Sequence, residues 1–375
     1  MDFGVSPATE KLCTEVAAFA DEVLAPCNAS DDAAGVLRPE LIAQLGAAGL
    51  LGLRVGTGYG GRGLSCVDTG MALEVVARAN FTACYPILNH ALIADVLASN
   101  DHPAGLSELA SGTALAALCL TEPEFGSDAA HIATVAEPDG SGWRISGVKA
   151  SIMLGTLATH GVVFARTGGP GARGVTAFYV PLDGVTRTGS RDIGNRAGGR
   201  ATLEFDGLRA EADDVIGAVG GGFVQVMRGF DYSRALIALM CLGCAQAALD
   251  DAWARARERT AFGKPIGSFQ GVAFPLVEHQ TMLRGARLLA LEALWRKDNG
   301  LAHSAEAGMV KWWAPKAAMD AAHQALLTFG QHAWSEESPM GQRMRDVIGL
   351  QIGDGTAQVA KLVAARAILG RDAAP

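Results

Sequence analysis

Cys119-Leu-Thr-Glu-Pro-Glu-Phe-Gly-Ser-Asp-Ala-Ala130 is the stretch at which the pattern of this 375-residue sequence changes. Before it, apolar residues recur at three- and four-residue spacing, which is typical of helices, and after it they alternate as in strands. Thr121 and Glu124 have the spacing of a helix capping box, but Gly126-Ser127-Asp128 would end a helix at once. We interpret the stretch as a polar turn with exposed hydroxyl and amide donors, and we expect a ligand site at this junction.

The same change of period divides the chain into three parts. Residues 1–117 predict an N-terminal helical domain, with helices over 7–25, 39–48, 65–79, 83–98 and 106–110. Residues 118–228 predict a central β-barrel or β-sandwich domain, with short strands over 131–136, 142–148, 161–165, 175–180 and 201–205. Residues 229–375 predict a C-terminal four-helix bundle, with helices over 234–259, 275–299, 303–329 and 356–369. The fold class expected is therefore a multi-domain α+β protein.

Composition argues against several classes of protein. Hydrophobic residues make up 49% and charged residues 19%, as in a globular chain. A net charge of -8 argues against a nucleic-acid partner, because phosphate binding needs a basic surface. The sequence start lacks the pattern of a signal peptide, and the uncharged run between Arg234 and Asp250 is too short for a membrane span. We expect a cytoplasmic protein without a membrane segment.

The seven cysteines fit reduced thiols better than a disulfide framework. Cys241-Leu-Gly-Cys244 matches C-x-x-C, but it lies in an apolar helical pattern and has no second pair to complete a zinc site. Small buried residues on one helix face explain the pair better. We therefore predict no metal site.

Leu120-Thr-Glu-Pro-Glu-x-Gly-Ser-Asp-Ala129 resembles the signature turn of the flavin-dependent acyl-CoA dehydrogenases. In that family the Thr and the turn amides contact the pyrimidine edge of the flavin, and the Ser lies near the cofactor and the thioester substrate. The resemblance implies these roles for Thr121 and Ser127, and it implies FAD as the cofactor. The general likeness covers residues 7–370.

A second specific resemblance is Arg259-x-x-Phe262-Gly263-Lys264-Pro265, followed by Phe269-Gln270. From the residues alone, arginines near the end of a helix oppose its dipole. An arginine also supplies the planar pair of donors that a phosphate accepts. The family resemblance implies that Arg259, Phe262 and Gln270 reach the pyrophosphate and adenine side of FAD on a neighbouring subunit. It therefore implies a homodimer or homotetramer.

Gln351-Ile-Gly-Asp-Gly-Thr-Ala-Gln358, which follows Arg345-Asp346, resembles the family's Glu-Gly-Thr-x-x-Ile stretch. In this register Asp354 takes the place of the catalytic Glu, and Thr356 and Gln358 take cofactor-contact positions. The residues alone would also allow Asp354 to be an ordinary turn residue or a helix cap. Removing a proton next to a thioester needs a carboxylate within hydrogen-bond reach. Because Asp is one methylene shorter than Glu, the backbone or the substrate must supply the missing reach.

Three further positions depart from the family pattern. Some branches carry the catalytic carboxylate just before the Arg of Phe230-Asp-Tyr-Ser-Arg234, where this chain has Ser233; we expect Arg234 to support the Asp354 loop. Where the family has an aromatic residue and a Thr against the flavin rings, this chain has Ser151 and Met153. Where it has Gln-x-x-Gly-Gly, this chain has Leu327-Thr-Phe-Gly330-Gln331. We take Ser151, Met153, Gly330 and Gln331 as candidate cofactor contacts.

The leading hypothesis is FAD-dependent α,β-dehydrogenation of a small or branched acyl thioester, carried by coenzyme A or a carrier protein, with an electron acceptor for the reduced flavin. One alternative is an oxidase or monooxygenase, in which Asp354 deprotonates a different carbon acid and the reduced flavin meets oxygen. The other alternative is a non-catalytic partner subunit. The intact Arg259, Phe262 and Thr121 argue against a subunit without its own site.

Overall fold

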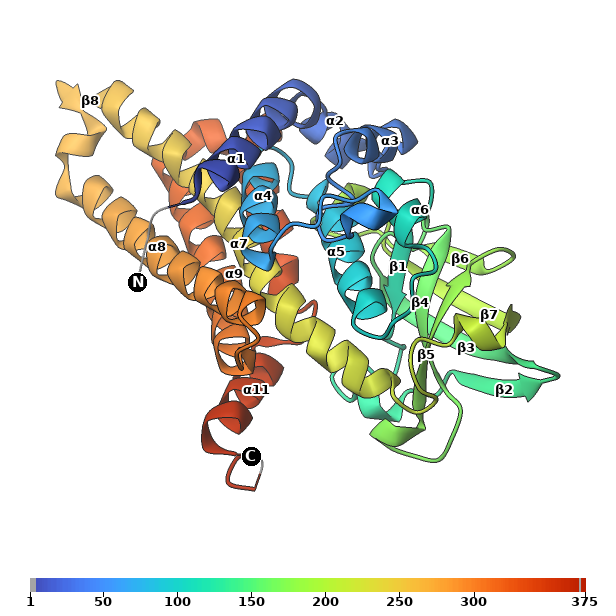
Figure 1. Cartoon of the computed structure of the whole chain (residues 1–375). Coiled ribbons are helices and arrows are strands. Elements are labelled where there is room, and N and C mark those ends of the chain that lie inside the picture. The colour runs from blue at the N-terminus through green and yellow to red at the C-terminus, as the bar shows by residue number, and fades with distance from the viewer. Residues whose placement is uncertain (1–4, 371) are drawn as a thin grey trace.

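The computed structural model describes residues 5–370 and 372–375, which form three parts in chain order (Figure 1). The N-terminal part consists of helices α1 Pro7–Phe19, α2 Ala25–Ala34, α3 Pro39–Ala47, α4 Cys66–Ala79, α5 Cys84–Ala98 and α6 Leu106–Ser111. The predicted first helix is longer than expected, because a π-helical turn over Ala20–Leu24 joins α1 to α2. Side-chain caps start two of these helices, since Ser6 and Ser65 accept the N–H groups of Thr9 and Asp68.

The central part is one seven-stranded sheet. Its strands are β1 Ala116–Cys119, β2 Val135–Asp139, β3 Gly142–Ile152, β4 His160–Arg166, β5 Val175–Pro181, β6 Thr186–Gly189 and β7 Ala201–Ala210. They pair in the order β1-β4-β2-β3-β7-β6, and β5 pairs with β4. Side chains from β1, β3, β4, β5 and β7, among them Ile145, Phe178 and Leu203, share one apolar cluster. The expected barrel or sandwich is therefore a single sheet that curls around its own core.

Two strands of this sheet were not predicted from the sequence. β1 is short and nearly all buried, so it shows no alternation, and it ends at Cys119. The residues directly before the polar turn thus form a strand and not a helix. β6 is mostly exposed and carries no apolar alternation either.

A second apolar cluster joins the sheet to the helices. Leu97, Leu106, Phe164 and Val226 bring α5, α6, β4 and the first turns of the long helix α7 (Gly222–Glu258) together. Leu120 and Ala129, at the two ends of the polar turn, are buried in the same cluster. The turn therefore lies beside the start of α7.

The C-terminal part is built on α7 Gly222–Glu258, with α8 Gln270–Asp298, α9 Ser304–Phe329, α10 Pro339–Ile348 and α11 Ala357–Leu369. A small hairpin, β8 Thr260–Ala261 and β9 Lys264–Pro265, connects α7 to α8.

Several bounds in this part differ from the predicted ones. α7 begins at Gly222 instead of the predicted Arg234, and α8 begins at Gln270 instead of the predicted Pro275. α10 was not predicted, although Ser338 caps it and Pro339 begins it. β1 and α7 run across the predicted domain boundaries at 117/118 and 228/229.

The apolar residues of α7 are mostly buried in the protein core. By length and apolar character this helix could cross a membrane, but 83% of its most apolar window is buried inside the protein. Its small residues allow close packing, since a Cβ at Gly243 would lie 2.2 Å from the Glu74 carbonyl oxygen on α4. Cys241 and Cys244 are buried free thiols on this helix. Among the described residues no cluster of metal-binding side chains occurs.

Candidate active site

A buried ion pair braces the polar turn after β1. Lys149 on β3 donates from Nζ to Glu122 Oε1 at 2.7 Å and to the Leu120 carbonyl oxygen at 3.0 Å. The Glu122 carboxylate also accepts the backbone N–H groups of Ala133 and Thr134. Burial lowers the pKa of Lys149 to about 8 against the opposing charge of Glu122. Burial alone would raise the pKa of Glu122, but Lys149 and the backbone donors outweigh it and hold this pKa below its usual value.

The turn itself contains no helix start. Glu122 and Phe125 exchange two backbone hydrogen bonds, at 3.1 and 3.2 Å, and the next helical residues form a short 3-10 turn over Ala129–His131. Ser127 is exposed, and a Cβ added at Gly126 would meet nothing within 4 Å. The capping-box alternative is therefore wrong, and the interpretation as an open polar turn is confirmed.

Thr121, Ser151 and Met153 lie together. The Ala150 N–H donates to the Thr121 carbonyl oxygen at 2.8 Å, which places the turn beside the end of β3. Ser151 has a left-handed backbone, with φ of 59°, and its hydroxyl accepts a hydrogen bond from Arg200 Nη1 at 2.9 Å. Met153 is half-buried and packs against the helical core. These three residues form one wall next to the turn.

Asp354 lies in the loop before α11 with a left-handed backbone, φ 55°. Thr356 caps α11, because its hydroxyl accepts the Val359 N–H at 3.3 Å. The helix-cap alternative for Asp354 is therefore wrong. Gln358 is exposed in the first turn of α11. The loop thus presents Asp354 separately from the helix end.

Two side chains secure the Asp354 loop. Lys311 on α9 donates to the carbonyl oxygens of Leu350 at 2.8 Å and Gly355 at 3.0 Å, one on each side of Asp354. Burial lowers the pKa of Lys311 to about 8, although the charge of Asp354 opposes this. Ser233 on α7 donates its hydroxyl proton to Asp354 Oδ2 at 2.7 Å. Sequence reasoning noted Ser233 only as the place of a missing carboxylate, and it missed Lys311; a lysine inside the apolar pattern of α9 was the available signal for Lys311.

Arg234 is buried beside this loop but has another partner. Its Nη1 donates to Asp231 Oδ1 at 2.8 Å, and Asp231 also accepts the Ser304 hydroxyl. Its Nη2 lies 3.9 Å from the position that a Cβ on Gly355 would take. Arg234 therefore flanks the loop, while Ser233 bonds to the carboxylate directly.

Other predicted site residues lie at the far end of α7. Arg259 ends the helix and is exposed. In the hairpin, Phe262 has φ of 52° and is 93% exposed, and its ring meets the edge of Phe269 at 6.1 Å. Gln270, at the start of α8, is also exposed. These side chains expose a cation and an aromatic face at the surface of the chain.

Gly330 and Gln331 belong to the same far end. The Arg255 guanidinium of α7 lies 5.7 Å from the ring centre of Phe329, the residue before Gly330. An open hollow of about 470 Å³ follows, lined by Phe329, Gln331, His332, Ser335, Glu337, Ser338 and Pro339. Both residues therefore lie near the end of α7 that carries Arg259.

The two groups are far apart within one chain. Phe125 of the turn and Phe230 of α7 pack on the same apolar cluster. From Phe230 to Arg259, a helix rising about 1.5 Å per residue extends roughly 40 Å. Figure 1 shows the sheet on one side of the molecule and the β8 hairpin on the opposite side. A single ligand reaches both groups only if a second chain supplies one of them.

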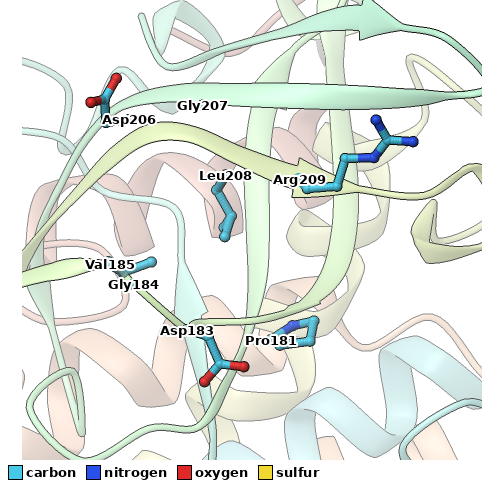
Figure 2. A pocket seen from close by; sticks show the side chains of 8 residues that line it. All are labelled: Pro181, Asp183, Gly184, Val185, Asp206, Gly207, Leu208 and Arg209. Atoms are coloured by element: carbon cyan, nitrogen blue, oxygen red, sulfur yellow. The ribbon is translucent and has the colours of Figure 1, made fainter.

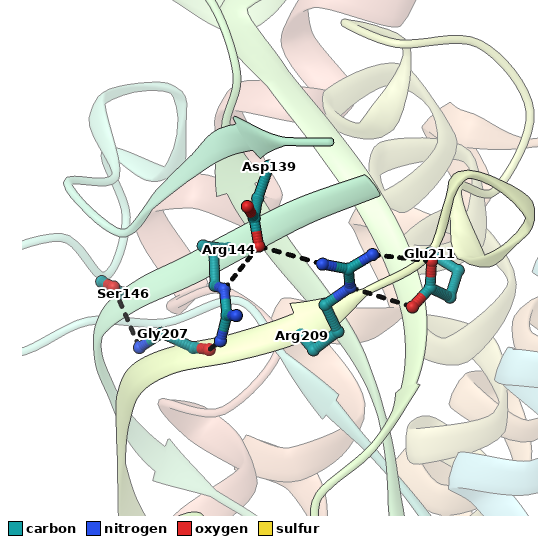
Figure 3. A network of polar contacts seen from close by, with 6 residues as sticks. All are labelled: Asp139, Arg144, Ser146, Gly207, Arg209 and Glu211. Atoms are coloured by element: carbon teal, nitrogen blue, oxygen red, sulfur yellow. Dashed lines mark hydrogen bonds and ion pairs between the residues drawn. The ribbon is translucent and has the colours of Figure 1, made fainter. Parts of the chain in front are cut away.

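A hollow on the sheet lies away from both groups. This space has a volume of about 410 Å³. Its lining residues, shown in Figure 2, are Pro181, Asp183, Gly184, Val185, Asp206, Gly207, Leu208 and Arg209. Arg209 is held by Glu211 and Asp139, and Asp139 also binds Arg144 (Figure 3). These partly exposed charges neutralise one another, as in an ordinary surface network. None of the predicted site residues lines this hollow.

Comparison with known sequences shows which family the chain belongs to. The sequence models of the acyl-CoA dehydrogenase N-terminal, middle and C-terminal domains match residues 6–100, 117–208 and 220–369. The chain belongs to the acyl-CoA dehydrogenase family. The short-chain specific acyl-CoA dehydrogenase of Bos taurus mitochondria is 33% identical, over 94% of this chain and 87% of that protein. The short-chain specific enzyme of Clostridium acetobutylicum is 30% identical, over 97% and 98% of the two chains.

The fold agrees with this membership. The structure of butyryl-CoA dehydrogenase from Megasphaera elsdenii superposes with a TM-score of 0.95 and 30% identity, over 98% of this chain and all of that chain. The predicted order of helical, β and helical parts is confirmed. As a member of the acyl-CoA dehydrogenase family, the protein is a FAD-dependent oxidoreductase.

The residues present suit FAD. The open turn and the wall of Thr121, Ser151 and Met153 offer hydroxyls, backbone amides and an apolar surface, as a flavin ring requires. The exposed Arg259 beside the exposed ring of Phe262 offers a phosphate partner and a stacking face. The chemistry of the two donor sets thus matches the two halves of one dinucleotide.

Proposed function

We propose that this acyl-CoA dehydrogenase family member catalyses α,β-dehydrogenation of a small or branched acyl thioester, with Asp354 as the base. The observation that carries this proposal is the fixed carboxylate of Asp354, bonded to Ser233 at 2.7 Å and mounted on a loop tied by Lys311. A general base needs this kind of fixed position, because a misplacement of about 1 Å costs roughly a hundredfold in rate. The short-chain and butyryl-CoA relatives support a small acyl group.

In the proposed reaction, the bond from the α-carbon to hydrogen gives its proton to Asp354. When bound, FAD would accept the hydride from the β-carbon and would pass the electrons to an electron acceptor. The substrate thereby loses two electrons and becomes the α,β-unsaturated thioester. The thioester is carried by coenzyme A or by a carrier protein.

We propose that the two groups of site residues hold the two halves of FAD. Thr121, Ser127, Ser151, Met153, Thr356 and Gln358 would face the flavin half. Arg259, Phe262, Gln270, Gly330 and Gln331 would face the pyrophosphate and adenine half of a cofactor on the neighbouring subunit. A homodimer or homotetramer is part of this proposal. The exposed apolar side chains of Phe274, Val277, Leu288 and Trp295 on α8 support such an assembly.

An oxidase or monooxygenase reaction is the second candidate. It is favoured by Ser151, which is exposed, and by Met153, which has no hydrogen-bond donor for the flavin. In this reaction Asp354 would deprotonate a different carbon acid, and oxygen would reoxidise the flavin. Rapid reoxidation of the substrate-reduced protein by dissolved oxygen would select this candidate over the dehydrogenase.

The experiment that tests the proposed function is stopped-flow reduction of the bound flavin by butyryl-CoA and branched acyl-CoA in Asp354→Asn. The substitution keeps the shape and the hydrogen bond from Ser233, but it removes the proton acceptor. We expect reduction to slow by about a hundred- to ten-thousandfold, with FAD content and melting temperature unchanged. Unaltered reduction would show that the proton goes elsewhere.

Asp354→Glu is the companion variant. If the pocket is built for Asp, the longer side chain loses the bond from Ser233 and reduction slows. Equal or faster reduction by Asp354→Glu would show instead that the site retains the geometry of the usual glutamate.

A further inference from the structure

We propose that Ser233 is a positioning residue that holds the carboxylate of Asp354, an inference that rests on the function proposed above. Ser233 lies on α7 with its side chain fully buried. Its hydroxyl is 2.7 Å from Asp354 Oδ2, whereas its distance to the Phe230 carbonyl oxygen within the helix is 3.4 Å. The shorter contact, to a charged acceptor, is the stronger one. The hydroxyl proton is therefore directed at the carboxylate.

This bond restricts the rotation of the Asp354 side chain. The backbone of the loop is already fixed by Lys311, which binds Leu350 and Gly355, and by the Thr356 cap. What remains is rotation about the two side-chain torsions of Asp354. Because Ser233 occupies Oδ2 alone, and no group within the described part of the chain donates to Oδ1, one oxygen anchors the carboxylate while the other can accept a proton.

Other charged or titratable groups near Asp354 are engaged elsewhere. Lys311 directs its ammonium group to two carbonyl oxygens, and Arg234 pairs with Asp231. Tyr85 on α5 faces the same region, and burial together with nearby negative charges, Asp354 among them, raises its pKa well above the ordinary value. In the part of the chain that the structure describes, Ser233 is thus the one side chain that donates directly to the Asp354 carboxylate.

The position of Ser233 also explains how a short acid can serve here. An Asp side chain has less reach than a Glu, so fewer of its orientations bring the carboxylate to the α-proton. A donor on the rigid helix α7 fixes that direction from outside the loop. Ser233 would therefore act on the rate of proton removal through Asp354, without contacting the reacting atoms.

The test compares Ser233→Ala with Ser233→Thr. Loss of a hydrogen bond to a charged group should slow flavin reduction by about ten- to a hundredfold. Because Ser233 acts through Asp354 and not on the substrate, the dissociation constant of the acyl thioester should stay unchanged while the reduction rate falls. Ser233→Thr keeps a hydroxyl and should restore the rate.

The matched control is Thr69→Ala, which removes another fully buried helix hydroxyl, one bonded to the Ser65 carbonyl oxygen at 2.9 Å on α4. It should leave the reduction rate unchanged. A rate that falls equally in Thr69→Ala, or that stays unchanged in Ser233→Ala, would overturn the proposal.

An infrared difference measurement separates this inference from the proposed function. The carboxylate stretching bands of Asp354, identified by their absence in Asp354→Asn, report hydrogen bonding to the carboxylate in protein without substrate at one fixed pH. Bands that move in Ser233→Ala, and that return in Ser233→Thr, support the contact even if Asp354→Asn still reduces its flavin. Unchanged bands in Ser233→Ala would contradict it whatever the reaction is.

Discussion

The two ends of α7 differ in how their site residues are held. At the first end, Asp354 and the turn of Thr121 are fixed from within the chain by Ser233, Lys311 and Lys149. At the far end, Arg259 and the 93% exposed Phe262 lie on a short hairpin that faces outward. The comparison suggests that the first end is prepared for chemistry by its own fold. In the function proposed above, the far end would contact a cofactor that another subunit presents.

The largest effect is expected when the buried ion pair of Lys149 and Glu122 at the first end is removed. Lys149→Met leaves the Glu122 carboxylate buried without its cation, which should lower the free energy of unfolding by about 3–5 kcal/mol. Lys264→Met, in the exposed hairpin at the far end, is the matched control and should stay within about 0.5 kcal/mol. Urea denaturation measures both variants. Equal losses of stability would remove the contrast between the two ends.

A smaller effect is expected at the far end, on binding and not on stability. Arg259→Ala should raise the dissociation constant of FAD about ten- to a hundredfold, because a charged hydrogen bond to phosphate is worth about 1.5–3 kcal/mol. Arg257→Ala removes an exposed charge from the same helix end and serves as control. If Arg259 only opposed the helix dipole, a contribution of about 0.3–1 kcal/mol, the two variants would weaken FAD binding alike in a fluorescence titration.

The sequence predicted the fold well wherever one period ran over many residues. The long helices of the bundle carry clear apolar patterns, and β4 and β5 are buried seven-residue runs with several β-branched and aromatic residues. β1 was missed because it has only four residues, none of them β-branched or aromatic, and β6 because it is mostly exposed. The start of α7 was placed too late, since Gly222 begins a helix in a glycine-rich stretch.

The candidate site was predicted less completely, for a physical reason. Family resemblance could point to Thr121, Arg259 and Asp354, because each lies in a local motif. It could not show that Ser233 bonds to Asp354, since the two residues are 121 positions apart and no local pattern links them. The bonds from Lys311 to the Asp354 loop likewise join α9 to residues 39 and 44 positions away. Such contacts follow from the packing of α7, α9 and α11.

The most direct test of this account is a mixed oligomer of Asp354→Asn subunits and Arg259→Ala subunits, isolated with two different affinity tags. If each site combines the Asp354 end of one chain with the Arg259 end of its neighbour, a mixed dimer holds one site with both defects and one intact site. We predict that flavin reduction, measured at limiting FAD, recovers to about half of the wild-type amplitude, although each variant alone is impaired. If both ends served a site within one chain, every site would carry one defect. Failure of the mixed oligomer to exceed the two parents would contradict the account.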